Sequence, residues 1–501
     1  MAAQDELFQL IKSLTPSEKR YFKVNGDSKS NYMQLFDAID KQKEEYDEDL
    51  LKRKNTKKAF TKYLSAEKKQ LREQIMKHMR SFHSTRAVDN QINELLQDET
   101  FMRDKGLNDQ REKVILKAKE LATKYERFHL LNEILGRQIA YVIEFEQKKL
   151  TEPVINLINE QKQLAVIVET ELELQTKNRE LFSIYRSGAD ILDPSVSNRV
   201  QMLVAEIERF WSRVGDWFSL GVIYHRGLSN YHQIRKDWLA SFEHTTKEYK
   251  LYQDHSHFKE EDSYYYKICL ANLMSRSLSS GEYKWFTAAL EEMKTVPIHS
   301  FNEEGEVFQN VYFQEHLYYI NAGEFGKAEE LIPEIEAGII KYASKINKAR
   351  KLAFQFNIMI MYFLLHNFKK ALEWTDLLMD DNSQIKENQK FITVLLLPFI
   401  HFELGHTDLV ESYSRAAYRR LKGKNRLHQF ERIVLSYLKQ MPLSTNDTNF
   451  SNTVGQFHNS LQKLADNPSS AKTIGMEELS LWAKSHVEGI PMYKQLSSIA
   501  H

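Results

Sequence analysis

A six-residue pattern recurs at nearly equal intervals in the second half of the chain, and this spacing constrains the fold more than any other feature. It occupies residues 281–286 (GEYKWF), 323–328 (GEFGKA), 366–371 (HNFKKA) and, more loosely, 405–410 (GHTDLV), with a degenerate copy at 106–111. The final positions of the four copies are 42, 43 and 39 residues apart. Each copy follows an apolar helical pattern and precedes an amphipathic one. The spacing predicts helical hairpins, which must stack on one another because a single hairpin cannot bury its apolar face.

The composition also favours helices. The 501 residues include 17 Gly and 9 Pro, which leaves few signals for turns and strand ends. With 42% hydrophobic residues the chain has ample material for a core. We expect an all-α protein rather than a large β protein or a Rossmann-type enzyme. The length fits about three domains or one long repeat array.

The six-residue pattern resembles the turn of the tetratricopeptide-repeat superfamily over residues 260–420, and more weakly over 90–260. The matching positions are Gly323, Phe325 and Ala328 around the turn, and Tyr319 and Tyr362 in the first helix. The resemblance implies a superhelical array of antiparallel helix hairpins, a tetratricopeptide-like α-solenoid. The period of about 42 exceeds the family's 34 residues, and the repeat-terminal proline is missing, so we expect longer helices or loops. Residues 10–23 (LIKSLTPSEKRYFK), joined to such an array, also resemble an uncharacterised bacterial helical-repeat family without a known activity.

We expect three segments: an N-terminal helical module at 1–88, the repeat array at 89–440, and a linker with capping helices at 441–501. Thr15 followed by Pro16 predicts a helix start in the module, and residues 140–185 read as long, coiled-coil-like helices. Leu481 and Trp482 are expected in a cap over the last repeat. The longest apolar stretch, 358–365, is far shorter than the about 20 residues that span a membrane, so we expect a buried core helix. The N-terminus lacks a signal-peptide pattern, which predicts a cytoplasmic protein.

Catalytic motifs such as GxxxxGK[ST], GxGxxG, HExxH and GxSxG do not occur. The single cysteine, Cys269, excludes an internal disulfide framework and is expected to be a buried small residue. His255 and His257 lie beside acidic residues, but their i, i+2 spacing suits a solvated loop better than a metal site. His401 and His406 are expected to pack or cap a helix end. We therefore predict no enzymatic activity, no cofactor and no metal.

Residues 52–86 form a strongly basic segment with twelve Lys or Arg against Glu67 and Glu73. Apolar residues interleave at helical spacing, with a basic helix expected from about Phe60 to Phe82. Such a segment can bind nucleic acid through its phosphates, or it can be a solvated face that the acidic run 44–49 neutralises. The candidate phosphate-binding residues are Lys52, Arg53, Lys54, Lys57, Lys58, Lys62, Lys68, Lys69, Arg72, Lys77 and Arg80.

Three amides share one register of the repeats. Asn272, Gln314 and Asn357 each lie fourteen residues before an aligned repeat position, and Leu396 takes the place in the last copy. An amide donates and accepts hydrogen bonds, so these side chains suit the backbone of a bound peptide, although bonds to neighbouring helices would explain them equally well. Tyr318 is a candidate aromatic anchor on the same surface.

Together these patterns predict a non-enzymatic scaffold, adaptor or regulator that binds a protein or peptide on the concave surface of a helical-repeat array. The alternative is a nucleic-acid-binding regulator that uses the basic N-terminal segment, with the repeats as sensor or dimerisation region. The net charge of +0 favours neither partner class.

Overall fold

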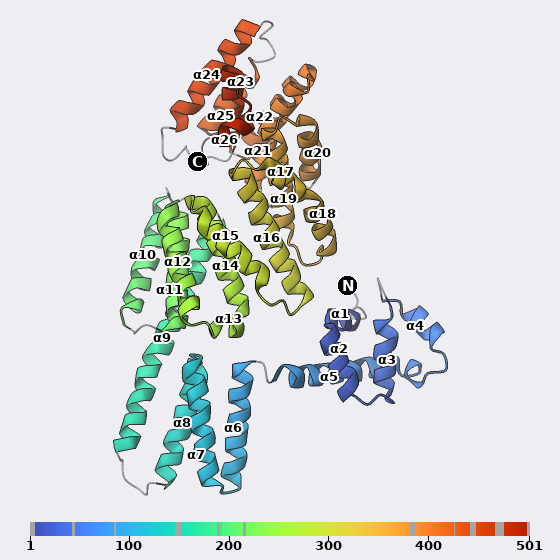
Figure 1. Cartoon of the computed structure of the whole chain (residues 1–501), viewed down its shortest axis with the longest axis vertical. Helices are drawn as coiled ribbons and strands as arrows, with labels where there is room; N and C mark the ends of the chain where they lie inside the picture. The colour runs from blue at the N-terminus through green and yellow to red at the C-terminus, as the bar shows by residue number, and fades with distance from the viewer. Residues whose placement is uncertain are drawn as a thin grey trace. The chain divides into compact units, whose positions relative to one another are not determined.

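The computed structural model describes residues 6–42, 46–84, 87–145, 152–187, 191, 193–213, 217–380, 387–424, 426–440, 447–465 and 475–497. Every regular element in these residues is a helix (Figure 1), as the composition predicts. No helix of the described residues is both long enough and apolar enough to cross a membrane. The contacts divide the chain into two compact units, Met1–Phe301 and Asn302–His501, which we call unit 1 and unit 2. The predicted segment boundaries at 88 and 440 remain predictions.

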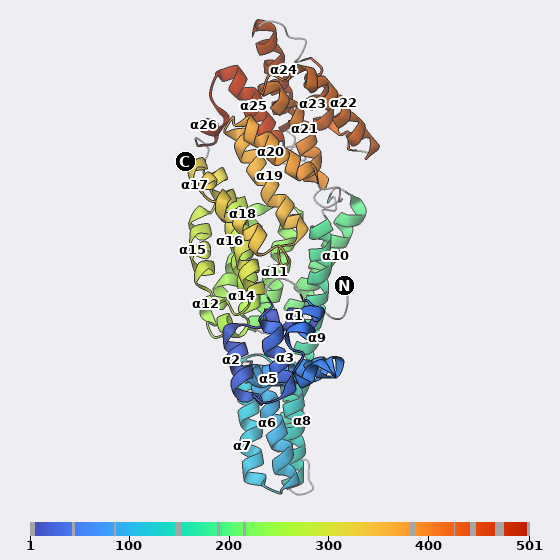
Figure 2. The ribbon, with the colours of Figure 1, turned by 90° about the vertical axis from the view of Figure 1, so that its right-hand side faces the viewer.

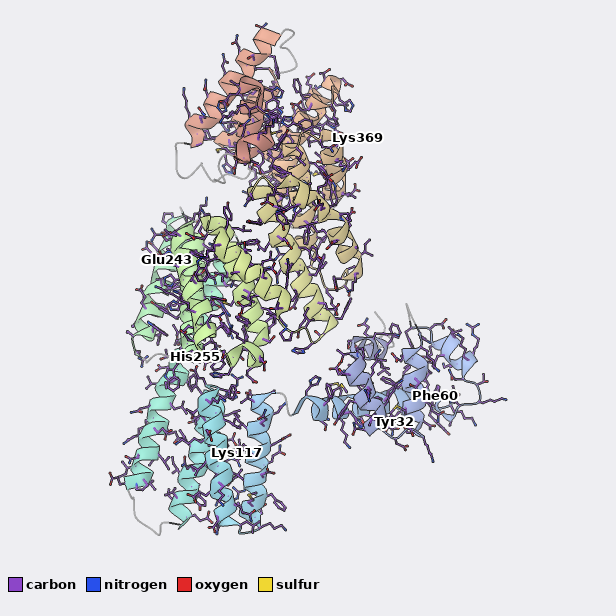
Figure 3. The ribbon with its side chains drawn as sticks, viewed as in Figure 1. Tyr32, Phe60, Lys117, Glu243, His255 and Lys369 are labelled. Carbon is purple, nitrogen blue, oxygen red and sulfur yellow. The ribbon has the colours of Figure 1, made fainter. Side chains whose placement is uncertain are left out.

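Unit 1 begins with a group of short helices that share their own core. They are α1 (Glu6–Ser13), α2 (Pro16–Asn25), α3 (Asn31–Asp40), α4 (Glu48–Lys54), the 3-10 turn η1 (Ala59–Thr61) and α5 (Leu64–Ser84). Tyr32 and Phe60, labelled in Figure 3, both belong to this core. The predicted helix start is confirmed, because Thr15 caps α2 and the Glu18 carboxylate accepts the Thr15 amide at 2.7 Å.

The rest of unit 1 consists of longer helices. They are α6 (Val88–Asp104), α7 (Asn108–Lys124), α8 (Phe128–Phe145), α9 (Glu152–Ser187), α10 (Pro194–Trp211), α11 (Phe218–Ile234), α12 (Trp238–Asp254), α13 (Phe258–Glu261), α14 (Ser263–Ser280) and α15 (Tyr283–Thr295). The 36-residue helix α9 confirms the prediction of a long helix before residue 185. Leu164 of α9 packs in the core of α6–α8, while Leu174 and Leu181 pack in the core of α10 and α11. One helix therefore serves two successive cores.

Unit 2 contains the remaining helices around one large core. They are α16 (Phe301–Asn321), α17 (Phe325–Glu330), α18 (Ile332–Lys341), α19 (Lys348–Leu364), α20 (Phe368–Met379), α21 (Glu387–Glu403), α22 (Thr407–Gly423), α23 (Gln429–Leu438), α24 (Asp447–Ala465), α25 (Met476–Glu488) and α26 (Met492–Ser497). The apolar stretch 358–365 lies at the end of α19 and is buried except for Leu365, as predicted for a core helix.

Seven junctions between consecutive described helices share the same tight turn. A residue one or two positions after the helix end adopts a left-handed conformation, with φ between 51° and 80°: Gly106, Glu126, Lys236, Gly281, Gly323, His366 and Gly405. In every case the next amide donates to the carbonyl five residues earlier, at 2.8–2.9 Å. This is the Schellman arrangement that ends helices. All five turns that the sequence predicts are confirmed.

The sequence pattern missed two of these turns, at Glu126 and Lys236. Both keep the aromatic residue two positions later, Phe128 and Trp238. Lys236 also has a small buried residue five positions later, Ser241. Neither turn has the glycine, or the His-Asn pair, that marks the other five turns. The aromatic residue two positions later was the remaining sequence signal that could have predicted them.

The C-terminal helices of unit 2 complete its core (Figures 1 and 2). Trp482 of α25 is fully buried and its ring centroid lies 4.8 Å from that of Phe399 in α21. The Glu403 carboxylate accepts a hydrogen bond from Nε1 of Trp482 at 2.6 Å and lies 2.7 Å from Nε2 of His486. Leu481 and Trp482 thus pack on the preceding helices, whereas residues 441–446 of the predicted linker lie outside the described residues.

Candidate binding surfaces

The three amides and the tyrosine predicted for the concave surface all lie on first helices of the pairs. Asn272 is half-buried on α14 in unit 1, and Gln314 is buried on α16 in unit 2. Tyr318 lies one turn after Gln314, with its ring centroid 5.5 Å from that of Tyr319. Asn357 lies on α19, and its Nδ2 is buried without a hydrogen-bond partner in the described part of the chain. Unit 2 therefore places Gln314, Tyr318 and Asn357 on adjacent helices, while Asn272 belongs to the other unit.

Asn357 lines a cavity of about 220 Å³ that lies between the first helices and the C-terminal helices of unit 2. Helices α16 and α19 supply one side of it, and α25 and α26 supply the other. Its lining consists of Leu317, Ile320, Asn321, Phe356, Asn357, Ile360, Leu364, Glu477, Glu478, Leu481 and Leu496. The C-terminal helices α25 and α26 thus cover the surface around Asn357, where the repeat register predicted contact with a peptide.

One end of this cavity is acidic. Glu477 and Glu478 begin α25, and no Lys, Arg or His is among the described residues of the lining. Burial raises the pKa of Glu478 to about 7, and the neighbouring Glu477 adds to this rise. Neither carboxylate forms an ion pair within the described part of the chain. This cavity could not be predicted from the sequence, because more than a hundred residues separate its two sides.

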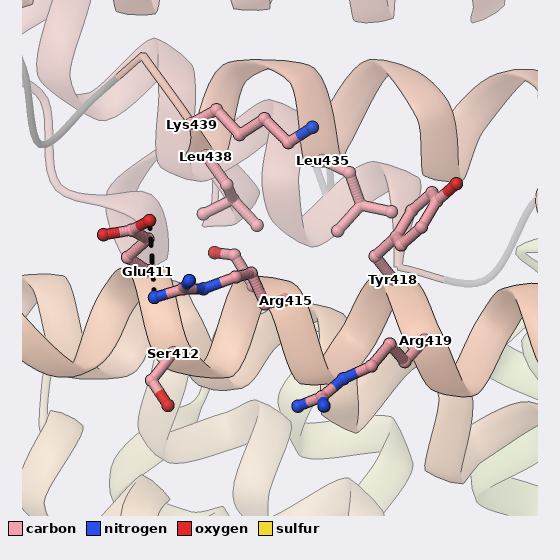
Figure 4. Close-up of a pocket in the computed structure, with 9 residues that line it drawn as sticks. Glu411, Ser412, Arg415, Tyr418, Arg419, Leu435, Leu438 and Lys439 are labelled. Atoms are coloured by element: carbon pink, nitrogen blue, oxygen red, sulfur yellow. Dashed lines mark ion pairs between the residues drawn. The ribbon is translucent and has the colours of Figure 1, made fainter.

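A larger groove of about 740 Å³ runs between α22 and α23 (Figure 4). Leu435 and Leu438 of α23 form its apolar side, and Tyr418 of α22 stands at one end of it. The remaining lining residues are polar or charged: Glu411, Ser412, Ser414, Arg415, Arg419 and Lys439. This combination of buried leucines, an exposed tyrosine and cations suits an amphipathic segment.

The rim of this groove is strongly basic. Arg415 is bridged to Glu411 at 3.4 Å, while the exposed Arg419 has no ion pair within the described residues. The ammonium groups of Lys422 and Lys439 lie 5.7 and 5.9 Å from the Tyr418 ring centroid. Between residues 415 and 439 the chain has eight Lys or Arg against one acid. That charge imbalance was visible in the sequence and was the missed signal for this groove.

The structure divides the predicted basic segment into paired and unpaired cations. The Glu48 carboxylate forms ion pairs with Lys52 at 2.8 Å and with Lys68 at 2.5 Å. The hydrogen bonds from these two ammonium groups lower the pKa of Glu48 to about 2. Lys58 donates to Gln34 at 2.9 Å. Glu44 and Glu45 of the predicted acidic run, and Arg86, lie outside the described residues.

The other candidate cations are exposed on this basic surface. Arg72 lies 4.0 Å from Glu6, and Arg53 Nε donates to the backbone carbonyl of Asp49. No ion pair with a described residue holds the remaining ones: Lys54, Lys57, Lys62, Lys69, Lys77 and Arg80. Tyr63 is 71% exposed between Lys62 and α5, which provides an aromatic face among these cations. The acidic neighbours therefore neutralise only part of the segment.

Cys269 and His401 pack as predicted, whereas His257 packs against Tyr125 although a solvated loop was expected. Cys269 is fully buried, and burial raises the pKa of its thiol well above the ordinary value, so it lacks the exposure of a nucleophile. The rings of His257 and Tyr125 pack edge to face with centroids 5.3 Å apart, and the rings of His401 and Tyr413 are stacked at 4.5 Å. Among the described residues no group of three His, Cys, Asp or Glu could hold a metal ion.

Three histidines that the sequence analysis did not single out meet between α11 and α12. Nδ1 of His225 lies 3.1 Å from Nδ1 of His244, and the rings of His232 and His244 are stacked with centroids 5.5 Å apart. Burial lowers the pKa of His225 and of His244 to about 4, and the nearby Lys247 adds to both shifts. The hairpin therefore holds these rings in the neutral form.

No family model matches the chain, and neither a curated protein nor a solved structure is similar to it.

Proposed function

We propose that the protein is a non-enzymatic scaffold or adaptor of the cytoplasm, with its helix pairs stacked as a tetratricopeptide-like solenoid, and that it binds a segment of a partner protein. The repeated turn supports the solenoid, because each turn returns the chain for another helix of the same stack. Asn272, Gln314 and Tyr318 remain proposed partner contacts on the first helices, whereas α25 and α26 cover the position of Asn357.

The groove between α22 and α23 is the observation that carries this proposal. Peptide helices bind in grooves by inserting apolar side chains, and tyrosine and arginine are enriched where binding energy concentrates. Here Leu435 and Leu438 offer the apolar contact, while Tyr418 and Arg419 stand exposed beside them. The unpaired cations favour an acidic amphipathic helix as the occupant.

Site-specific photo-crosslinking in the native host tests the groove directly. A photoreactive amino acid at Ser412, which lines the groove, should yield one defined crosslinked protein. The same group at Ser436, which is exposed on α23 but does not line the groove, is the matched control. The double variant Tyr418→Ala and Arg419→Glu should reduce capture at least tenfold, because it removes one aromatic and one charged contact. Equal crosslinking from Ser412 and Ser436 would contradict the proposal.

A second candidate function is nucleic-acid binding by the N-terminal basic surface. The exposed, unpaired lysines and the exposed Tyr63 favour it, because ammonium groups bind phosphates and an aromatic face stacks on a base. Charge reversal should use Lys54, Lys57, Lys62 and Lys69, which bridge to no described acid. Lys68 is unsuitable because it is half-buried and paired with Glu48.

The quadruple change of these four lysines to Glu should abolish a gel shift with single-stranded RNA or DNA. Wild-type binding should weaken steeply between 50 and 200 mM salt, as counterion release requires. The control changes four exposed lysines outside this surface to Glu, so that its net charge is equal: Lys247, Lys250, Lys284 and Lys369. Retained binding by the first variant, or equal loss in the control, would exclude the basic surface as the site.

A further inference from the structure

The cavity between α16, α19, α25 and α26 combines an apolar body with a polar end. Seven of its lining residues are apolar: Leu317, Ile320, Phe356, Ile360, Leu364, Leu481 and Leu496. Its polar groups are two carboxyl and two amide side chains, those of Glu477, Glu478, Asn321 and Asn357. A few polar groups placed in an apolar cavity are characteristic of small-molecule sites.

One of the polar groups is a buried donor without a described acceptor, and another is a carboxyl without a described cation. The Nδ2 of Asn357 is buried and donates to no described atom, and leaving a buried donor unsatisfied destabilises a folded protein. The Glu478 carboxyl is half-buried beside the exposed Glu477 and accepts backbone hydrogen bonds at the start of α25, but no described cation lines the cavity. A ligand that accepts a hydrogen bond from Asn357 and brings a cation to Glu478 would satisfy both groups.

The volume limits the size of such a ligand. A cavity of about 150 Å³ holds benzene, and pockets for drug-sized ligands begin at about 300 Å³. At about 220 Å³ this cavity lies between the two. It therefore fits a molecule with one ring, or a branched chain of similar size, and a short polar arm.

We propose that this cavity binds a small amphipathic amine, with its apolar body among the leucines, its ammonium group at Glu478 and a neutral oxygen at Asn357. The site is independent of the groove between α22 and α23, so it adds a small-molecule ligand to the proposed protein-binding function. Because α25 and α26 form one side of the cavity, a bound amine stabilises their packing on α16 and α19.

Calorimetry on the full chain tests this site with 2-amino-1-phenylethanol as the probe. The probe carries the ring, the hydroxyl and the ammonium group that the cavity calls for. Phenyl-1,2-ethanediol replaces only the ammonium group, and it should bind at least tenfold more weakly because a charged hydrogen bond is lost. 2-Phenylethylamine lacks the hydroxyl and should bind severalfold more weakly than the probe.

Variants assign the two polar contacts. Glu478→Gln should weaken the amine at least tenfold and leave the diol unchanged, and it should fold because glutamine has nearly the same shape as the half-buried glutamate. Glu488→Gln, an exposed position at the far end of α25, is the matched control and should bind as the wild type. Asn357→Leu should remove the advantage of 2-amino-1-phenylethanol over 2-phenylethylamine. Thermal unfolding confirms that each variant is folded.

Binding should also depend on pH. Glu477 and Glu478 are the only titratable groups among the described lining residues, since α16, α19 and α26 contribute none. With the pKa of Glu478 at about 7, the amine should bind about tenfold more tightly at pH 8 than at pH 6. No binding of the amine at millimolar concentration, equal binding of the diol, or an undiminished affinity in Glu478→Gln would overturn the proposal.

Discussion

Single residues determine how each helix pair turns. Gly405 adopts φ +76° after α21, and a Cβ placed there would meet nothing within 4 Å. The strain of a side chain at this position would therefore come from the backbone alone, which makes the turn a clean case for measuring the cost of the left-handed conformation.

We expect Gly405→Ala to destabilise unit 2 by about 1–2 kcal/mol, the cost of a left-handed alanine. Gly326→Ala is the control, since Gly326 lies inside α17 with open space around it. That change should leave stability equal or raise it by about 1 kcal/mol, as alanine favours helices. Urea denaturation measures both. A loss in Gly326→Ala as large as that in Gly405→Ala would show that conformation is not the cause.

Five turns could be predicted from the sequence because glycine or histidine–asparagine marks them. Glu126 and Lys236 adopt the same left-handed conformation, although neither residue type favours it. The Glu126 carboxylate accepts the amides of Phe218 and Ser219 at 2.9 and 2.7 Å and so caps α11. Contacts from a distant helix thus stabilise a turn that local sequence preference would not select.

At the scale of the element, the stability of the hairpin of α11 and α12 should decrease in acid. Unfolded histidine titrates near 6.5, while His225 and His244 titrate at about 4 in the folded hairpin. The unfolded chain therefore binds more protons between these values. The stability that the neutral rings contribute is complete above about pH 6.5 and is lost as the pH falls to about 4.

Lowering the pH from 7 to 4.5 should consequently reduce the melting temperature of unit 1 by several degrees. In His244→Phe, which keeps an aromatic ring and removes the titration, the decrease should be smaller. Scanning calorimetry at matched ionic strength measures both proteins. His299→Phe, outside this cluster, serves as the control. An identical pH dependence in wild type and His244→Phe would contradict the role of the cluster.

The candidate sites were only partly predictable from the sequence, because some of their residues come from distant helices. The register of Asn357 could be predicted from the repeats, because it depends only on spacing within one helix. That Glu478 lies in the same cavity could not, since α25 carries no repeat pattern and reaches the α19 side of the cavity only in the folded chain. The groove at Tyr418 was partly predictable, because its basic residues are adjacent in the chain.

At the scale of the whole molecule, the large core of unit 2 draws its buried residues from positions 320 to 492. We therefore expect a fragment of residues 299–501 to fold without unit 1. It should be highly helical by circular dichroism and should unfold in one cooperative thermal transition. A fragment with helical signal but no cooperative transition would show that this core needs the other unit.

The same core has a consequence for how the protein is made. Phe399 and Phe457 pack against Trp482, so their pocket stays open on the ribosome until the segment containing Trp482 emerges. Domains fold in the order of synthesis at about 5–20 residues per second. Unit 1 can thus be finished while the nascent second half still exposes an apolar face. If translation stalls before Trp482, the product keeps an exposed apolar surface that the complete chain buries. That surface is what chaperones and proteases would recognise.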